Sequence, residues 1–364
     1  MEGIKLKSSF VERVRGHLQE PFTLIDVGCG GGIYSGWHSF GTRLHAFGFD
    51  PDVDDITRLQ SEEGNPNVEY VAAFVRAAGA HPFQPGKLDY STLSRNPWAR
   101  LSVARTIELN EKQSNDSKVK LLNLWPKKRL VQPSSAIVLR DFFDERRLHA
   151  IDFVKIDVDG SDYEILTSLD DCLHERQILG VGIEVNFFGS DCETDHTLHN
   201  VDRYMKSKGF ELFDLSVRRY SMAALPSRYV YASPAQTEYG RPLQGDALYL
   251  RDLGSGLYEE FAGGLSVSKL LKAACLFELF GLPDCAAEVL LCFQDRMEPA
   301  VPVRDLLDQL VPTDISHGEY LRRFEKNDPS FFTPKARVKR RLYPARRVLK
   351  KIAARIGIAE RLRL

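Results

Sequence analysis

Residues 24–37 read LIDVGCGGGIYSGW, and four of the five positions 28–32 are glycine. These glycines come directly after a short apolar run. Each glycine costs conformational entropy on folding, so such a cluster is typical of a backbone that turns sharply or approaches a ligand closely. Residues 23–28 predict a buried strand, and we expect a helix between them and the next strand. A strand that ends in a glycine turn before a helix exposes backbone N–H groups, which favours a polar or anionic ligand.

The spacing of these glycines narrows the choice of ligand. Gly28, Gly30 and Gly32 follow Asp26 as D-x-G-x-G-x-G, whereas the dinucleotide fingerprint places its third glycine three residues after the second. This spacing resembles motif I of Rossmann-like S-adenosylmethionine methyltransferases. Asp50, at the end of the next apolar run, is placed to accept hydrogen bonds from ribose hydroxyls. The alternative is a tight turn without a ligand.

Apolar runs and helical patterns alternate along most of the chain. The predicted strands are 23–28, 44–50, 68–74, 151–157, 180–186, 210–217 and 245–251. Strands that alternate with helices indicate a parallel sheet covered on both faces. Residues 76–135 break this regularity with scattered prolines and two of the three tryptophans, and we interpret them as an insertion.

The chain is expected to contain four parts. These are an N-terminal helix over 1–20, a sheet domain over 21–252 with the insertion at about 76–135, a helical hairpin region over 253–325 and a basic amphipathic tail over 326–364. The hairpin is predicted from two apolar helical segments joined by the turn LPD.

A second motif points to a family. Residues 151–169, IDFVKIDVDGSDYEILTSL, closely resemble the K-I-D-V-E-G-x-E-x-x-V-L-x-G block of FkbM-type S-adenosylmethionine-dependent methyltransferases. The segments 138–148 and 183–189 are similar to the parts that flank this block. The resemblance spans about 20–252 and implies a Rossmann-like class I methyltransferase fold. That fold has a seven-stranded, mostly parallel sheet with helices on both faces, here with a C-terminal helical appendage, and its cofactor is S-adenosylmethionine.

Two carboxylates at predicted strand ends are candidates for catalysis. A methyl transfer to a hydroxyl needs a group that takes the proton, and Asp157 is the first candidate, with Glu184 second. As alternatives, Asp157 caps the following helix and Glu184 binds the backbone or a lysine such as Lys155. A divalent metal held by the two carboxylates is not favoured, because no third ligand is evident. We therefore expect no metal site, and we expect His196 and His199 on a solvated helix face.

Charge divides the chain unevenly. Twelve of the 49 Lys and Arg residues lie in 335–364 with a single acid, Glu360, so the rest of the chain is acidic. Apolar residues recur at helical spacing in this tail, which is typical of an amphipathic helix on an anionic membrane surface or of a solvated tail. An acidic body argues against nucleic-acid binding. Six cysteines without a C-x-x-C pair and no apolar leader favour a cytoplasmic protein.

These features together predict a methyltransferase that moves the methyl group of S-adenosylmethionine to an oxygen of a saccharide or other secondary-metabolite or glycan acceptor. Trp98, Trp125 and the tyrosine-rich stretch 220–231 either stack against that acceptor or belong to the core. The alternative from another class is a non-catalytic scaffold protein with the same fold in a polysaccharide-assembly complex. A dinucleotide oxidoreductase is disfavoured by the glycine spacing.

Overall fold

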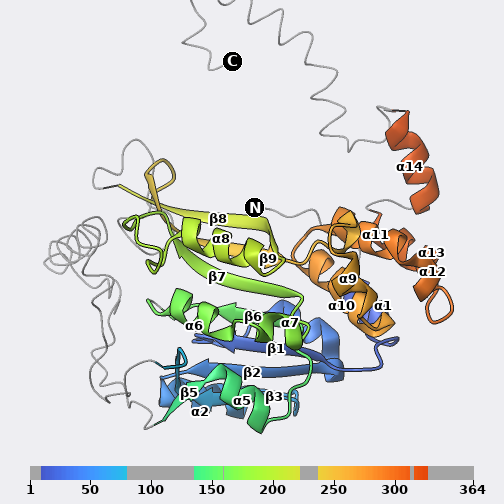
Figure 1. Ribbon diagram of the computed structural model, residues 1–364. Helices are drawn as coiled ribbons and strands as arrows, with labels where there is room; N and C mark the ends of the chain where they lie inside the picture. The colour runs from blue at the N-terminus through green and yellow to red at the C-terminus, as the bar shows by residue number, and fades with distance from the viewer. Residues whose placement is uncertain (1–9, 80–134, 159, 222–236, 312–314, 327–364) are drawn as a thin grey trace, which may run out of the picture. The chain divides into compact units, whose positions relative to one another are not determined.

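The computed structural model describes residues 10–79, 135–158, 160–221, 237–311 and 315–326 (Figure 1). The chain divides into two compact units, one of Ser9–Val301 and one of Met1–Ser8 with Pro302–Leu364. Nearly all of the expected insertion and of the expected basic tail falls outside the described residues, as do Trp98, Trp125 and most of the stretch 220–231.

Seven strands form one sheet in the order β3-β2-β1-β6-β7-β9-β8. All neighbouring strands are parallel except β9, which is antiparallel to both β7 and β8. The strands are β1 Phe22–Val27, β2 Leu44–Asp50, β3 Val68–Ala72, β6 Phe153–Ile156, β7 Gly180–Asn186, β8 Glu211–Tyr220 and β9 Arg241–Leu250. The strand order reverses between β1 and β6, which is the point where ligands bind in open α/β sheets. The expected seven-stranded, mostly parallel Rossmann-like sheet is confirmed.

A two-stranded parallel sheet lies beside the main one. It pairs β4 Phe74–Arg76 with β5 Ala136–Val138, so the strand expected over 68–74 ends at Ala72 and a separate strand follows.

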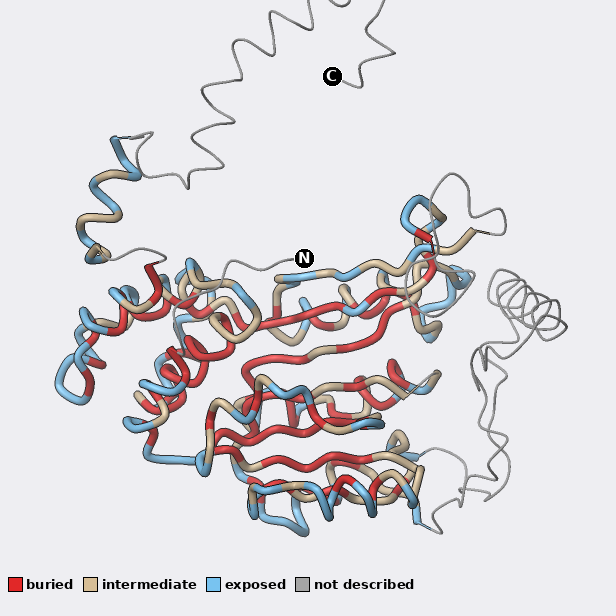
Figure 2. The backbone as a smooth tube through the Cα atoms, turned by 180° about the vertical axis from the view of Figure 1, so that it is seen from behind, coloured by how far each residue is buried: buried red, intermediate tan, exposed pale blue. Residues whose placement is uncertain are grey.

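One face of the main sheet carries the hydrophobic core. Side chains alternate along each strand, and Ile25, Val27, Phe49 and their neighbours pack there against three helices. These helices are α5 Leu139–Glu145, α6 Asp162–Leu169 and α8 Leu198–Ser207 (Figure 1). The buried positions concentrate in the central strands and in the helix α10, as Figure 2 shows. The opposite face also buries apolar side chains, among them Phe22 and Phe153 in contact with Trp37, and it carries polar side chains near the carboxyl ends of the strands.

The connection after the glycine turn differs from the expected helix. It is a 3₁₀ helix, η1 Ser35–Arg43, interrupted by Gly41 at φ 56°, and it is followed through β2 by α2 Val53–Glu62. Trp37 and Phe40 are buried three residues apart, which is the spacing at which side chains of a 3₁₀ helix align. The segment 161–174 forms two helices instead of one, because Asp170 takes φ 42° between α6 and α7 Cys172–Glu175.

Helices follow the last strand. They are η2 Leu253–Ser255, α9 Glu259–Gly263, α10 Val267–Leu279, α11 Pro283–Cys292 and α12 Gln294–Met297, with α13 Val303–Leu310 and α14 His317–Glu325 in the other unit. The segments α10 and α11 form the expected hairpin. At the N-terminal end, the helix α1 Phe10–Val14 packs against α10, and the chain leaves the helix after Val14. Among the described residues, no helix is long and apolar enough to cross a bilayer.

A buried cluster of three charged side chains attaches the helix α10 to the sheet. Lys269 Nζ donates to Asp152 Oδ1 at 2.6 Å and to the Ile151 carbonyl at 2.8 Å, and Lys272 Nζ lies 3.1 Å from Asp152 Oδ2. All three charged side chains are fully buried. Burial tends to raise the pKa of Asp152, but the two lysines outweigh it and hold the pKa below its usual value. The hairpin is therefore attached to the amino-terminal edge of β6 by charge as well as by apolar contact.

Candidate functional site

The strand register brings the predicted acids to one edge and one face of the sheet. Asp26 of β1 lies opposite Lys155 of β6, and Asp157 follows two residues after Lys155 on the same face. Asp50 is the last residue of β2, and Glu184 lies two residues before the end of β7. The carboxyl ends of the parallel strands β1, β2, β6 and β7 therefore carry all four carboxylates.

Lys155 is the centre of this group. Its Nζ donates to Asp26 Oδ1 at 3.1 Å and to the Gly28 carbonyl at 2.8 Å, and it lies 3.5 Å from Asp157 Oδ2. Burial lowers the pKa of Lys155, but Asp26 and Asp157 more than offset this and raise the pKa overall. Burial raises the pKa of Asp26 to about 6, although Lys155 acts against it. The ammonium group of Lys155 thus contacts the glycine turn, the buried carboxylate of Asp26 and the exposed carboxylate of Asp157.

The glycine turn is closely packed on one side and open on the other. Gly28 has φ 81°, and a β-carbon built on it would lie 1.7 Å from the Asp157 carbonyl oxygen, so only glycine fits. A β-carbon on Gly30 would lie 3.2 Å from Asp50 Oδ2. Gly31, at φ 80°, has open space around it and donates its N–H to Asp55 Oδ2 at 2.9 Å. The turn therefore places backbone that carries no side chain next to Asp50, the last residue of β2.

The Asp50 carboxylate is held in place by the backbone. Its Oδ1 accepts a hydrogen bond from the Asp52 N–H at 2.8 Å, and its other oxygen faces Gly30. Burial raises the pKa of Asp50. A carboxylate fixed beside a glycine turn at the end of the second strand can accept hydrogen bonds from the two hydroxyls of a ribose. These residues fit a nucleoside-bearing cofactor.

Ser161 is the N-cap of α6 and Asp162 is its first residue, so Asp157 does not occupy the cap position. The Asp162 carboxylate accepts hydrogen bonds from the Val158 N–H at 2.9 Å and from the Gly160 N–H at 3.0 Å. Asp157 is left beside Lys155 with 41% of its side chain exposed, while the side chain of Asp26 is 2% exposed. The capping alternative is therefore wrong for Asp157, and Asp159 lies outside the described residues. A carboxylate that is exposed, next to a cation and at a strand end can accept a proton from a bound hydroxyl.

Glu184 has other partners than Lys155. Its carboxylate accepts hydrogen bonds from Arg218 of β8 and, at 3.1 Å, from Gln244 of β9, and its side chain is 9% exposed. Arg218 also lies 3.3 Å from Asp246 Oδ1. Burial lowers the pKa of Arg218, but Glu184 and Asp246 raise it overall. Glu184 is thus part of a charge network across β7, β9 and β8.

His196 is not on a solvated helix face. It lies ahead of α8 with a 6% exposed side chain, and its Nε2 donates to the Glu184 carbonyl at 2.7 Å. His199 is exposed. The sequence pattern missed His196 because its partner oxygen belongs to a strand that ends ten residues earlier. The residues Lys155, Arg218 and Asn186 were likewise not selected as site residues, although the position of Lys155, two residues before Asp157, could have indicated the first of them.

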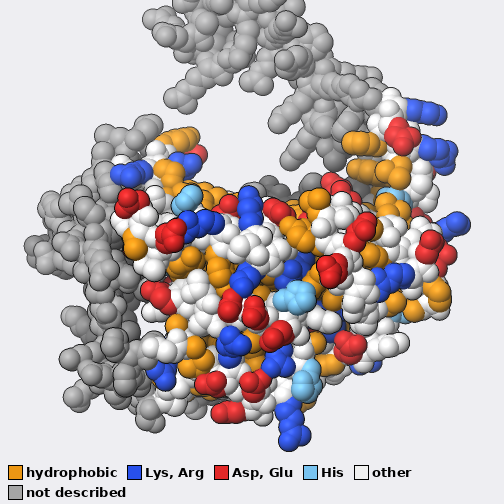
Figure 3. All heavy atoms as spheres, viewed as in Figure 1, with side chains coloured by type: hydrophobic (Ala, Val, Ile, Leu, Met, Phe, Trp, Pro, Cys, Tyr) orange, Lys and Arg blue, Asp and Glu red, His pale blue; other side chains and the backbone are white. Residues whose placement is uncertain are grey.

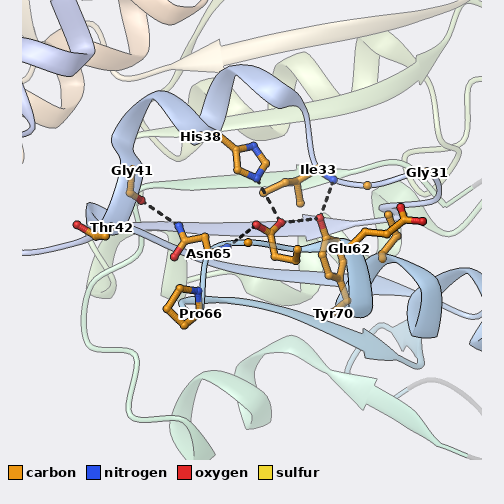
Figure 4. Close-up of a pocket in the computed structure, with 13 residues that line it drawn as sticks. Gly31, Ile33, His38, Gly41, Thr42, Glu62, Asn65, Pro66 and Tyr70 are labelled. Atoms are coloured by element: carbon orange, nitrogen blue, oxygen red, sulfur yellow. Dashed lines mark hydrogen bonds and ion pairs between the residues drawn. The ribbon is translucent and has the colours of Figure 1, made fainter.

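A pocket of about 610 Å³ lies on the other side of the glycine turn, between η1 and α2 (Figure 4). Gly31, Gly32 and Ile33 form one end of it. Inside it, Glu63 Oε2 contacts His38 Nε2 at 3.2 Å and the Tyr70 hydroxyl at 3.5 Å, as the dashed lines in Figure 4 show. Of the predicted site residues, only Gly32 lines this pocket, so it is separate from the group of strand-end carboxylates.

Acidic and basic side chains are mixed over the face of the molecule shown in Figure 3. Within the described ranges, no group of three or more His, Cys, Asp or Glu side chains is arranged to hold a metal ion.

Comparison with solved structures gives distant matches. A protein of Listeria monocytogenes described as an S-adenosylmethionine-dependent methyltransferase is 11% identical, covering 67% of this chain and 99% of that one, with a TM-score of 0.30. A methyltransferase of the same cofactor class from Aquifex aeolicus is 12% identical, covering 68% and 96%, with a TM-score of 0.26. A TehB-like one from Corynebacterium glutamicum is 12% identical, covering 67% and 89%, with a TM-score of 0.25. No curated protein matches the chain.

The family match is more direct. Residues 87–212 match the model of the Methyltransferase FkbM domain, and this range contains the 151–169 block and the acids Asp157 and Glu184. The glycine turn and Asp50 precede the matched range, and the structure places them beside it. The resemblance noted from the sequence is confirmed over residues 87–212, which match the FkbM methyltransferase domain.

Proposed function

We propose that this methyltransferase transfers the methyl group to a hydroxyl oxygen, with Asp157 as the general base. The observation that carries this assignment is the position of the Asp157 carboxylate, which is partly exposed and lies 3.5 Å from Lys155 Nζ, the ammonium that donates to the Gly28 carbonyl of the glycine turn. A base that adjoins the turn that holds the cofactor is within reach of a hydroxyl placed for in-line attack. The proposed acceptor is a saccharide or another secondary-metabolite or glycan hydroxyl.

The cofactor site in this proposal is built from Asp26, Gly28, Gly30, Gly32 and Asp50. Asp50 accepts hydrogen bonds from the ribose, and the glycine turn lets the backbone approach the ligand. Asp26 acts through Lys155, which it holds against the Gly28 carbonyl. When bound, S-adenosylmethionine supplies a methyl group on a positively charged sulfur.

In the proposed reaction Asp157 takes the proton of the acceptor hydroxyl while the new carbon–oxygen bond forms. The cofactor would leave as a neutral thioether that keeps the electron pair of the broken carbon–sulfur bond, and Asp157 would hold the proton until it is lost to water. Lys155 keeps the carboxylate oriented towards the turn. The charge is balanced, because one positive sulfur and one carboxylate become two neutral groups.

Glu184, the second candidate base, has a different proposed role. Arg218 and Gln244 already bind its carboxylate, so releasing it to take a proton would leave a half-buried guanidinium without this partner. We assign Glu184 to orienting the strand ends around the acceptor site.

The first experiment measures cofactor binding by calorimetry on the full chain. Asp50→Ala is expected to weaken S-adenosylmethionine binding by about tenfold or more, since it removes a charged hydrogen-bond acceptor. Asp54→Ala, which removes an exposed carboxylate four residues away, is the matched control and leaves binding unchanged. NAD serves as the ligand control. No binding of S-adenosylmethionine to the unaltered chain would refute the proposal and favour the scaffold alternative.

The second experiment measures turnover as release of S-adenosylhomocysteine with a panel of hydroxylated acceptors. Asp157→Asn is expected to lower the rate by about 10²–10⁴-fold without weakening cofactor binding, because only proton transfer is lost. An Asp157→Asn rate equal to that of the unaltered enzyme would contradict the role of Asp157.

The location of the enzyme is also a proposal. We place it in the cytoplasm, with the basic residues of 335–364 holding it at an anionic membrane surface near a glycan precursor and with no nucleic-acid partner. Removing residues 335–364 is expected to abolish sedimentation with vesicles that contain anionic lipid. Unchanged sedimentation would contradict this location.

A further inference from the structure

The side-chain amide of Asn186, at the end of β7, makes hydrogen bonds through its nitrogen but, within the described residues, none through its oxygen. Asn186 is the last residue of β7 and follows Glu184 by two positions on the same face of the sheet. Its Nδ2 donates to the His196 carbonyl at 3.3 Å and lies 3.4 Å from His196 Nδ1. Its Oδ1 is buried, and no group in the structure donates to it within the described part of the chain.

The orientation of this amide follows from its neighbours. His196 Nε2 donates to the Glu184 carbonyl at 2.7 Å, which fixes the ring beside the Asn186 amide. A flipped Asn186 amide would place its oxygen against the His196 carbonyl, which is also an acceptor. Nδ2 therefore faces His196, and the side-chain oxygen faces away from it.

A buried carbonyl without a donor is costly. Leaving such a group unpaired is unfavourable, and most buried polar groups in native proteins have a partner. Asn186 lies at the carboxyl end of a parallel strand, which is where ligands bind in this fold. The register of β6 and β7 pairs Ile156 with Ile183, so Asp157 and Asn186 come at the same edge of neighbouring strands.

We propose that Asn186 Oδ1 accepts a hydrogen bond from a second hydroxyl of the methyl acceptor, so that the enzyme selects polyhydroxy compounds. This inference rests on the proposed function, since it takes the acceptor to lie beside Asp157. His196 acts as a positioning residue, because it holds the amide in the orientation that presents the oxygen. Asn186 is a specificity-determining residue and takes no part in the proton transfer.

The test measures binding of neutral sugars to the full chain loaded with S-adenosylhomocysteine. The probes are methyl glucoside, methyl galactoside and methyl mannoside, each with its set of monodeoxy analogues, followed by saturation-transfer NMR and titration. We expect at least one parent glycoside to bind about tenfold or more tightly than one of its deoxy analogues, as the loss of one hydrogen bond to a buried acceptor predicts. In Asn186→Leu the parent and that analogue are expected to bind equally.

Two controls separate this role from a structural one. Asn67→Leu removes an amide that donates to the Thr42 carbonyl at the other edge of the sheet, and it is expected to keep the discrimination. Asn186→Asp keeps the accepting oxygen and is expected to restore part of the discrimination that Asn186→Leu loses. Thermal melting of each variant shows whether it is folded.

The outcomes separate this inference from the proposed function. If the unaltered chain binds S-adenosylhomocysteine but none of the glycosides, or if Asn186→Leu still discriminates, the inference is wrong and the methyltransferase assignment stands. If Asn186→Leu weakens S-adenosylmethionine as much as the glycoside, the amide serves the cofactor and the inference is also wrong. Failure of the unaltered chain to bind the cofactor contradicts the proposed function itself.

Discussion

Replacing Lys155 by methionine removes the ammonium that Asp26 faces across β1 and β6, while keeping a side chain of similar length. In the folded protein, burial raises the pKa of Asp26 from 3.8 to about 6. Because the pKa of Asp26 is higher in the folded than in the unfolded protein, its carboxyl contributes most to folding stability at low pH. That contribution is lost as the pH rises through the folded pKa. At about 1.4 kcal/mol per pKa unit, keeping Asp26 ionised above pH 6 costs about 3 kcal/mol.

Without Lys155 the pKa of Asp26 rises further, so the carboxyl keeps its proton to a higher pH than in the unaltered protein. Holding that proton at pH 7 costs about 4 kcal/mol relative to an unfolded aspartate, and the cost grows by about 1.4 kcal/mol for each further pH unit. The unaltered protein stops losing stability from this group near pH 6, whereas the variant continues to lose it. The extra loss in Lys155→Met is therefore close to zero at pH 5 and grows above pH 6 by at most about 1.4 kcal/mol for each pH unit.

Urea unfolding at pH 5, 6, 7 and 8 measures this difference. The lost bond to the Gly28 carbonyl adds a constant offset that does not change with pH. In an Asp26→Asn background the pH-dependent part is expected to vanish, because the titrating group is gone. A difference between Lys155→Met and the unaltered protein that is constant from pH 5 to 8, or one that persists in Asp26→Asn, would refute the reasoning.

Two further substitutions test the turn and the buried charge cluster. Gly28→Ala is expected to destabilise the protein by more than the ~1–2 kcal/mol of left-handed backbone strain and to abolish S-adenosylmethionine binding in calorimetry, because its β-carbon would overlap the Asp157 carbonyl. Gly31→Ala, with the same sign of φ and open space, is the control and loses only the strain energy. Asp152→Asn leaves two buried ammonium groups without their carboxylate and is expected to cost about 3–5 kcal/mol in urea unfolding. Lys272→Met is expected to cost less, since Lys269 still pairs with Asp152, and equal losses in these two variants would contradict the charge argument.

The sequence pattern predicted the sheet well because its signals are local. An apolar run, a glycine turn and a helix stop each depend on neighbours within a few residues, and all seven predicted strands are present with small shifts at their ends. The differences arise where backbone torsion overrides the pattern. Gly41 and Asp170 take positive φ values, which makes a kinked 3₁₀ helix of the first connection and two helices of the segment 161–174.

The acids of the candidate site were identified from the sequence, but their partners were not. Asp26, Asp50, Asp157 and Glu184 all come at strand ends, which a strand pattern and a family block can locate. Their pairing depends on the register of strands that are far apart in the chain. Lys155 meets Asp26 across 129 residues.

The chain itself determined that a glycine turn precedes an acid, that strands and helices alternate, and that an FkbM block follows, since these are properties of short segments. The tertiary structure alone decided which partners each acid has. It bonded Asp162 to the loop before α6, paired Glu184 with Arg218 from a strand that begins 27 residues later, and left Asp157 exposed beside Lys155. The physical reason is that the availability of a carboxylate depends on the cations and N–H groups that folding brings to it, and most of these come from distant parts of the chain.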